Sequence, residues 1–342
     1  MRQAARSYRL YVGIDISART FTVATIQTGQ MPSRVQTFSQ TRSGFDQLQR
    51  QLLNLEADPT AILVVLQATG TYWMRLALDL MSAQIAVAVV NRAQAHDFAK
   101  ALLKRSKTDA IDAQTLAELA ARLQPHRWTP PPVVRSEVQQ RLAVSDVLVE
   151  GRSQFRNQLH ALERQPLVIE SVRTRLQELI ATLNQQIAEV EQELRAALEQ
   201  DAAWAAAAAH LSTLKGLGAL TIAWILTATG NFKLTATPEA AANYAGVVPQ
   251  LYESGRSVRG RTSIGHSGHA RLRQALSMAT LSAIQHNPLS KAFYQRLIAR
   301  GKPKKVAVCA AARKLLRIAW AVATKKQSFD LDYAQRQLAR AA

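Results

Sequence analysis

The sequence has little cysteine, few acidic residues and no long apolar run. Its one cysteine, Cys309, has no partner for a disulfide within the chain, and the apolar residues around it (VAVCAAA) predict a place in a hydrophobic core. A chain without disulfides is typical of a reducing compartment, so we expect a cytoplasmic protein. No segment reaches the roughly 18 consecutive apolar residues of a transmembrane helix, and residues 1–10 lack the apolar stretch of a signal peptide. We therefore expect no association with a membrane.

Acidic residues are outnumbered by basic ones. The 342 residues include 43 Lys and Arg against 24 Asp and Glu, which gives a formal net charge of +19. A charge of this size attracts polyanions, of which nucleic acid is the commonest and an anionic membrane the alternative. Residues 251–342 hold 18 Lys and Arg against 3 Asp and Glu, a net charge of +15. The affinity for polyanions is therefore concentrated near the C-terminal end.

Alternating strand-like and helix-like segments predict an α/β domain in residues 1–130. Continuous apolar runs such as AILVVL are typical of strands that are buried on both faces of a sheet. Helices are indicated between them by apolar residues that recur with helical spacing. The pattern predicts strands over 8–15, 20–26, 61–66 and 85–90, and helices over 45–53 and 72–81.

The proline run Trp-Thr-Pro-Pro-Pro132 ends this domain, because three prolines continue neither a helix nor a central strand. Residues 131–205 then predict an arm of two long helices, over 136–163 and 170–200, on either side of Pro166. Heptad-like spacing of apolar residues in the second helix indicates an antiparallel coiled coil, with an ordinary core helix as the alternative. The spaced residues are Leu176, Ile180, Leu183, Ile187, Val190 and Leu194.

Residues 206–342 predict a mainly helical C-terminal domain, with helices over 219–229, 240–244 and within 271–322. A polar, glycine-rich and basic segment interrupts them at 252–269. The turn Lys-Gly-Leu-Gly218 opens the first of these helices. Its backbone N–H groups suit a phosphate, but a tight turn without a ligand explains the two glycines equally well.

Two carboxylates, Asp109 and Asp112, stand three residues apart at the start of a predicted helix and share one of its faces. Such a pair suits a divalent metal ion, although acidic residues also favour the positive N-terminal end of any helix. Asp15 ends the first predicted strand, and Gln67 ends the strand at 61–66. Strand, strand and helix that converge on one metal site are typical of RNase H-like nucleases.

Six blocks of the sequence together resemble a known family. They are VGIDIS, LQATGTYW, KTDAIDAQTLAEL, NYAGVVPQLYESGRSVRG, LRQALSMA and GKPKKVAVCAAARKLL. In this order they are similar to the insertion-sequence one-hundred-and-ten family of DEDD transposases, described as bridge-RNA-guided recombinases. The resemblance runs from Tyr11 to Phe329. It implies a RuvC-like (RNase H fold) N-terminal domain that carries four acids, a coiled-coil arm and a C-terminal transposase domain with a serine nucleophile.

The resemblance assigns roles to individual residues. Asp15, Asp109 and Asp112 correspond to three of the four metal-binding acids. The fourth, a glutamate in the family's Glu-Ala-Thr-Gly block, falls on Gln67, whose neutral amide predicts weaker binding of Mg²⁺ (or Mn²⁺) and an intact fold. The nucleophile falls on Ser254, although a Ser-Gly pair alone is more typical of a turn. The resemblance implies that Ser254 attacks a DNA phosphodiester and forms a covalent phosphoserine link before the strands are exchanged and resealed.

Basic residues near and after this serine predict contacts with nucleic-acid phosphates, because guanidinium groups match phosphate oxygens. Two histidines of the same segment predict hydrogen bonds to phosphate instead of zinc binding, since no cysteine is nearby. Arg317 belongs to the same basic cluster. The predicted nucleic-acid-binding residues are Arg256, Arg259, Arg261, His266, His269, Arg271, Lys302, Lys304, Lys305, Arg313 and Lys314.

The leading prediction is an RNA-guided DNA recombinase. The resemblance implies donor and target double-stranded DNA, a structured bridge RNA, a homodimer or homotetramer, and a bacterial protein that associates with the nucleoid. Two alternatives remain open. The first is a hydrolytic RuvC-like nuclease, in which water replaces the serine as nucleophile. Detection of a covalent protein–DNA adduct would exclude this alternative. The second is a catalytically inactive nucleic-acid-binding protein, which the neutral Gln67 supports. Strand joining by the Gln67→Glu variant would exclude this alternative.

Overall fold

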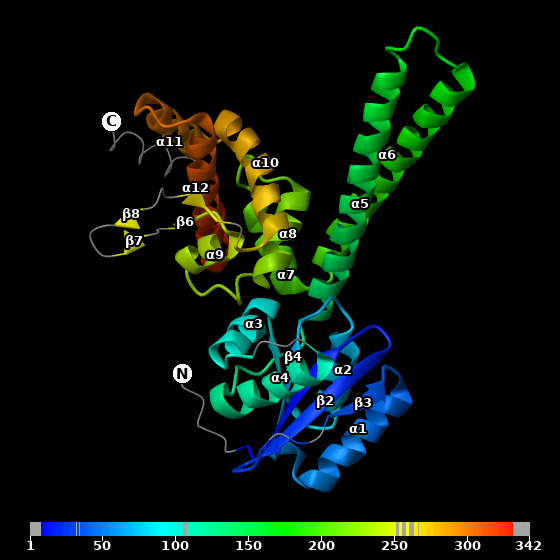
Figure 1. Ribbon diagram of the computed structural model, residues 1–342. Coiled ribbons are helices and arrows are strands. Elements are labelled where there is room, and N and C mark those ends of the chain that lie inside the picture. The colour runs from blue at the N-terminus through cyan, green and yellow to red at the C-terminus, as the bar shows by residue number, and fades with distance from the viewer. Residues whose placement is uncertain are drawn as a thin grey trace. The chain divides into compact units, whose positions relative to one another are not determined.

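The computed structural model describes residues 8–330 apart from 32, 34, 105–107, 251–252, 255–257, 260–262 and 266 (Figure 1). Of residues 253, 254, 258 and 259 it describes the backbone and its strand pairing only. The chain divides into two compact units, Met1–Pro130 and Pro131–Ala342. Each unit is described by itself. The further division of the second unit into an arm (131–205) and a C-terminal domain (206–342) stays a prediction.

A five-stranded sheet forms the centre of the first unit, with the strand order β3-β2-β1-β4-β5. β1 pairs in parallel with β4, and β4 with β5, whereas β2 and β3 add antiparallel strands beyond β1. The strands are β1 (Leu10–Ile16), β2 (Thr20–Gln27), β3 (Gln36–Ser39), β4 (Ile62–Gln67) and β5 (Ala86–Val90). The sequence predicted four of them to within two residues but did not predict β3.

Side chains that alternate along the strands supply a separate core on each face of the sheet. On one face, α1 and α2 cover the even-numbered residues of β1; on the other, α3 and α4 cover the odd-numbered ones. The helices are α1 (Arg42–Leu55), α2 (Trp73–Ser82), α3 (Arg92–Ala101) and α4 (Asp109–Leu123), with a short 3-10 turn, η1 (Pro59–Ala61), before β4. This mixed sheet with helices on both faces confirms the predicted RNase H-like fold (Figure 1).

The backbone of α4 lies directly on β1 at Gly13. A Cβ atom at Gly13 would stand 2.1 Å from the Ala117 nitrogen and 2.2 Å from the Ala113 carbonyl oxygen. No side chain fits there, so glycine is what permits this contact. The contact fixes where the N-terminal half of α4 crosses the sheet.

The second unit is helical, as predicted, with two small antiparallel ribbons between α9 and α10. Its helices are α5 (Val133–Leu162), α6 (Glu170–Glu199), α7 (Ala202–Ser212), α8 (Ala219–Thr229), α9 (Pro238–Ala245), α10 (Ala270–His286), α11 (Pro288–Ala299) and α12 (Lys304–Thr324). The ribbons are β6 (Pro249–Gln250) with β9 (Ser263–Ile264), and β7 (Glu253–Ser254) with β8 (Val258–Arg259). In the described part of the chain, no helix has the length and apolar character to cross a membrane.

The long helices α5 and α6 lie side by side as an antiparallel pair (Figure 1). At the base of the pair, Ile187, Val190 and Leu194 are buried, while Leu176 and Ile180 nearer the tip are only half-buried. The predicted heptad positions therefore form the seam. Other apolar side chains remain outside it and are exposed to solvent: Val144, Val147, Leu167, Ile169, Val172 and Leu179.

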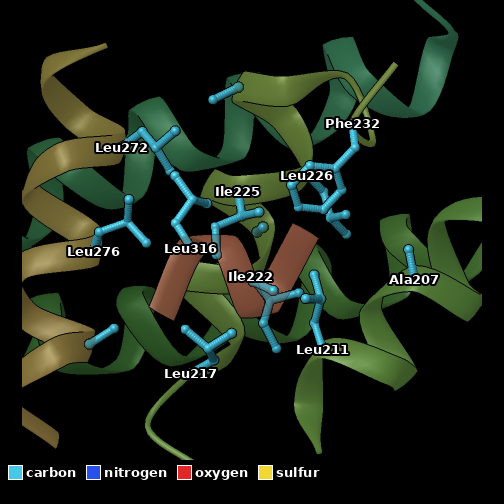
Figure 2. Close-up of a cluster of buried hydrophobic side chains, with 14 of the residues drawn as sticks. Ala207, Leu211, Leu217, Ile222, Ile225, Leu226, Phe232, Leu272, Leu276 and Leu316 are labelled. Carbon is cyan, nitrogen blue, oxygen red and sulfur yellow. The ribbon is translucent and has the colours of Figure 1, made fainter. Parts of the chain in front are cut away.

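The base of the pair shares one hydrophobic core with α7–α10 and α12. In Figure 2, Leu226 of α8, Leu272 of α10 and Leu316 of α12 point toward a common centre. Gly216, in the turn before α8, packs against α10, because a Cβ there would lie 2.6 Å from the Ala283 Cα. This close packing explains the first glycine of the Gly-Leu-Gly turn without a phosphate.

Candidate active site

Asp15 and Gln67 stand next to each other at the carboxyl ends of two central strands. The parallel register pairs Ile14 with Leu66, and Asp15 and Gln67 are the residues that follow them. Alternation along the strands places both on the face that α4 covers, because Gly13, two residues before Asp15, contacts α4. Both residues are half-buried.

The helix α4 brings the two remaining acids to the same face. Thr108 caps its N-terminus by accepting a hydrogen bond from the Ile111 backbone N–H at 3.2 Å. Asp109 is the first helical residue, and Asp112 directly precedes Ala113, whose carbonyl oxygen contacts Gly13. Two strands and the start of one helix thus carry three carboxylates and one amide on one side of the sheet.

These four side chains fit a hard divalent cation by their chemistry, because Mg²⁺ and Mn²⁺ prefer oxygen ligands. The Gln67 Nε2 atom donates a hydrogen bond to the Thr69 hydroxyl at 3.5 Å. The other amide atom, Oε1, is the one with lone pairs for a cation. Within the described residues, no three His, Cys, Asp or Glu side chains lie close enough together to share a metal ion. The donors are therefore of the right type and on one face, but they do not form a closed metal cluster.

In the second unit, Ser254 lies in a short hairpin. It pairs with Val258, and Glu253 pairs with Arg259, so residues 255–257 connect the two strands. In the sequence, the two strands of the β6–β9 ribbon precede and follow this hairpin, and Gln250 pairs with Ser263. Of the basic residues predicted to surround the serine, Arg256, Arg261 and His266 lie outside the described residues, and the side chain of Arg259 is not described.

His269 caps the N-terminus of α10, and its Nδ1 accepts the Leu272 backbone N–H at 3.2 Å. Its ring lies against Trp224 and Tyr244, with ring centroids 5.8 and 5.9 Å away. Burial lowers the pKa of the imidazole, and the positive Arg135 lowers it further. Because Nδ1 accepts this hydrogen bond, Nε2–H is the ring donor that the predicted contact with a phosphate would use.

The other predicted nucleic-acid-binding residues fall into two groups. Arg271 forms an ion pair with Asp146 at 3.1 Å. Lys305, Arg313 and Lys314 line a groove beside α12, while the exposed Lys302 and Lys304 precede or begin that helix.

The groove also contains residues that the sequence analysis did not assign to it. Cys309 was predicted as a core residue but is half-buried and lines the groove. Lys325 and Phe293 line it as well. Lys305, Cys309, Arg313 and Arg317 recur every four residues, so each lies beside the next on the surface of a helix, and this spacing was the signal in the sequence.

Comparison with known proteins extends over most of the chain. A family model described as a transposase of the DEDD IS110 type matches residues 12–165, and one for the transposase IS116/IS110/IS902 family matches residues 208–295. The pilin gene-inverting proteins of Moraxella bovis and Moraxella lacunata are 30% and 29% identical over 324 residues, 94% of this chain and 98% of theirs. The transposase for insertion sequence element IS1328 of Yersinia enterocolitica is 25% identical over 303 residues, 80% of this chain and 86% of its own.

The chain belongs to the IS110 family of transposases. As a member it is an enzyme of DNA transposition and recombination, and its substrate is DNA. The DEDD type of the family implies a divalent metal ion. The first matched range includes Asp15, Gln67, Asp109 and Asp112, and the second includes Ser254. Both ranges end before α12.

Proposed function

We propose that this IS110-family transposase recombines DNA through a covalent phosphoserine intermediate and chooses its sites with a structured RNA. The Ser254 Oγ attacks a DNA phosphodiester, a new O–P bond forms, and the bond to the leaving sugar oxygen breaks, that oxygen taking up a proton. Because the phosphoserine keeps the energy of the phosphoester, a sugar hydroxyl of another strand reseals the break without ATP. The observation that carries the proposal is the place of Ser254 in a hairpin of the most basic part of an IS110-family chain.

Asp15, Asp109 and Asp112, with the amide oxygen of Gln67, would hold Mg²⁺ or Mn²⁺ on the α4 face of the sheet. A bound ion would supply positive charge for the oxygens of the scissile phosphate. The parallel register of Asp15 and Gln67 and the contact of α4 with Gly13 support this assignment. The three carboxylates would attract the ion, and the neutral amide of Gln67 would make this attraction weaker than a fourth carboxylate would.

DNA and RNA bind to the basic surface of the second unit, and two or four copies of the chain assemble around them. Residues 251–342, with a net charge of +15, support the nucleic-acid contacts. Exposed apolar side chains on the helix pair support assembly, since Val147 and Leu167 are 69% and 76% exposed. The family resemblance also implies that the acidic site of one copy acts with the serine of another. RNA guidance rests on the family resemblance and on this charge.

Restoring the fourth carboxylate tests the metal assignment. The Gln67→Glu variant is expected to bind Mn²⁺ at least about tenfold more tightly, because even partners that only orient a ligand change metal affinity by roughly 10–100-fold. Its covalent adduct with DNA in the presence of Mg²⁺ and the cognate RNA is expected to increase accordingly. Calorimetry with Mn²⁺ measures the first effect, and a denaturing gel measures the second.

The matched control is Gln47→Glu, which adds the same charge to an exposed position on α1, across the sheet from α4. Equal Mn²⁺ affinities of the Gln67→Glu variant, the control and the parent chain would contradict the metal assignment. DNA cut with free ends and no adduct would favour a hydrolytic nuclease. No cutting by the Gln67→Glu variant assembled on RNA and DNA would favour a binding protein, the alternative that Gln67 supports.

A further inference from the structure

A groove of about 1530 Å³ runs along α12 in the second unit. Its walls come from α9, α11 and α12, from the β6–β9 ribbon and from the segment that follows α12, up to Asp330. Sites for single small molecules measure roughly 300–1,000 Å³. The groove is therefore larger than such a molecule needs, and its open, elongated wall along a helix suits a segment of a polymer.

The charge of the groove is strongly positive. The described lining residues include five Lys or Arg and one acid, Asp330. Arg317 forms an ion pair with Glu239 at 2.7 Å, and Lys314 lies over the ring of Phe293 at 4.6 Å. The cations of this wall are Lys305, Arg313, Lys314, Arg317 and Lys325, spread along the whole of α12 and just beyond it.

Between the cations the groove is apolar and partly aromatic. Trp320, Phe329 and Ile318 line it and also pack against the hydrophobic core, so their positions are fixed. The Trp320 indole N–H donates to the Thr235 carbonyl at 3.0 Å, which holds the ring in one orientation. A positive wall that contains aromatic rings is how proteins bind unpaired nucleotides, with phosphates on the cations and bases on the rings. In a duplex the base faces are already stacked on one another, so an apolar floor adds nothing to its binding.

The groove begins at the segment that carries Ser254. Pro249, Ser263 and Ile264 of the β6–β9 ribbon line it. Ser254 follows Pro249 by five positions in the sequence, so their Cα atoms are at most about 18 Å apart, since an extended chain spans at most ~3.6 Å per residue. A strand bound in the groove is thus within a few nucleotides of the serine.

We propose that this groove binds an unpaired DNA strand next to the phosphate that Ser254 attacks. This proposal rests on the proposed function. The phosphates lie along Lys305, Arg313 and Lys325, and bases lie against Trp320 and Phe329. In this way the protein holds the strand on one side of the break while the other end is exchanged. The matched family ranges end before α12, so the wall that carries the cations of the groove lies outside them.

The single cysteine allows a test on the unaltered groove. Cys309 lies in its wall, so bound DNA is expected to slow modification of this thiol by a maleimide. The full-length Ser254→Ala protein, which is expected to form no adduct, is mixed with one of three probes. These are a twelve-nucleotide oligo-dT, a twelve-base-pair DNA duplex and a twelve-nucleotide oligo-U. Oligo-dT is expected to protect Cys309 at least about fivefold more than the duplex at equal concentration, because stacking on aromatic rings needs unpaired bases.

A double variant tests the cations. Lys305→Gln with Arg313→Gln removes two phosphate contacts and is expected to reduce the salt slope of oligo-dT binding by about 1.4, at ~0.7 per single-strand phosphate. The control pair, Lys233→Gln with Lys291→Gln, removes the same charge at exposed positions that do not line the groove, and its slope is expected to match the parent. Melting curves verify that both variants are folded. Because neither readout needs Ser254, failure of the serine mechanism leaves this test unaffected.

Four results would overturn the proposal. Equal protection of Cys309 by duplex and oligo-dT would show that unpaired bases are not recognised. Stronger protection by oligo-U would assign the groove to RNA. Protection of Cys309 in the absence of DNA that increases with protein concentration would assign the groove to a second copy of the chain. Protection in the absence of DNA that is lost when residues 331–342 are removed would assign it to the chain's own C-terminal end.

Discussion

Replacing Ser254 with alanine is expected to abolish the covalent adduct between this transposase and DNA while leaving DNA binding unchanged within about twofold. The substitution removes the Oγ atom that attacks phosphorus and no charge. Ser254 takes part in its hairpin through backbone pairing with Val258, which alanine preserves. Removing a single hydroxyl group while this backbone pairing is kept is expected to change the free energy of unfolding by about 1 kcal/mol or less. The loss of adduct is therefore expected without a loss of fold.

The measurement is a denaturing gel of labelled DNA in the Gln67→Glu background, with Mg²⁺ and the cognate structured RNA. Ser267→Ala is the matched control, because Ser267 is an exposed serine of the same region, where it accepts a hydrogen bond from Gln250. The control is expected to retain its adduct. An adduct that persists in Ser254→Ala would show that another residue is the nucleophile.

Burial explains which elements the sequence predicted well. The strands β1, β4 and β5 are buried on both faces, so their apolar runs mark them clearly. β3 was missed because it is a mostly exposed edge strand, QTFS, that pairs only with β2. α3 was missed because Ala95 is its one buried residue, which leaves no apolar periodicity to read.

Cys309 shows where an apolar run misleads. The run VAVCAAA is apolar in every position, but a helix turns successive residues to different sides. Ala307 and Ala311 are buried in α12, while Val306 and Cys309 line the groove. Composition alone does not say which side of such a helix packs on the core. The prediction that Cys309 is a core residue was wrong because the residue lies on the side that faces the groove.

Only part of the candidate site could be predicted from the sequence. The ends of two strands and the start of one helix pointed to Asp15, Asp109 and Asp112. The register that sets Asp15 beside Gln67 needed the strand pairing, which no local pattern specifies. Ser254 was recognised through the family resemblance, since its Ser-Gly pair alone is more typical of a turn.

A single methyl group at Gly13 is expected to disrupt the first unit. In Gly13→Ala the new Cβ would stand 2.1 Å from the Ala117 nitrogen, a backbone atom that moves only with the whole of α4. Inserting atoms into a packed core typically costs about 1–3 kcal/mol, and a clash with a helix backbone belongs at the upper end of that range. For a unit of this size, about 3 kcal/mol corresponds to a fall in Tm of roughly 10 °C. Circular dichroism measures the fall.

Gly151→Ala is the matched control. It makes the same substitution within α5, where the nearest atom outside the helix backbone is a Leu183 methyl at 3.9 Å, and is expected to raise stability by about 0.4–1 kcal/mol. Where Gly13→Ala still folds, the shift of α4 also moves Asp112, which directly precedes the contact, so Mn²⁺ affinity in the Gln67→Glu background is expected to fall with it. A Gly13→Ala protein as stable as its parent would mean that α4 does not pack on β1 at this point, and the placement of Asp109 and Asp112 beside Asp15 would lose its main structural support.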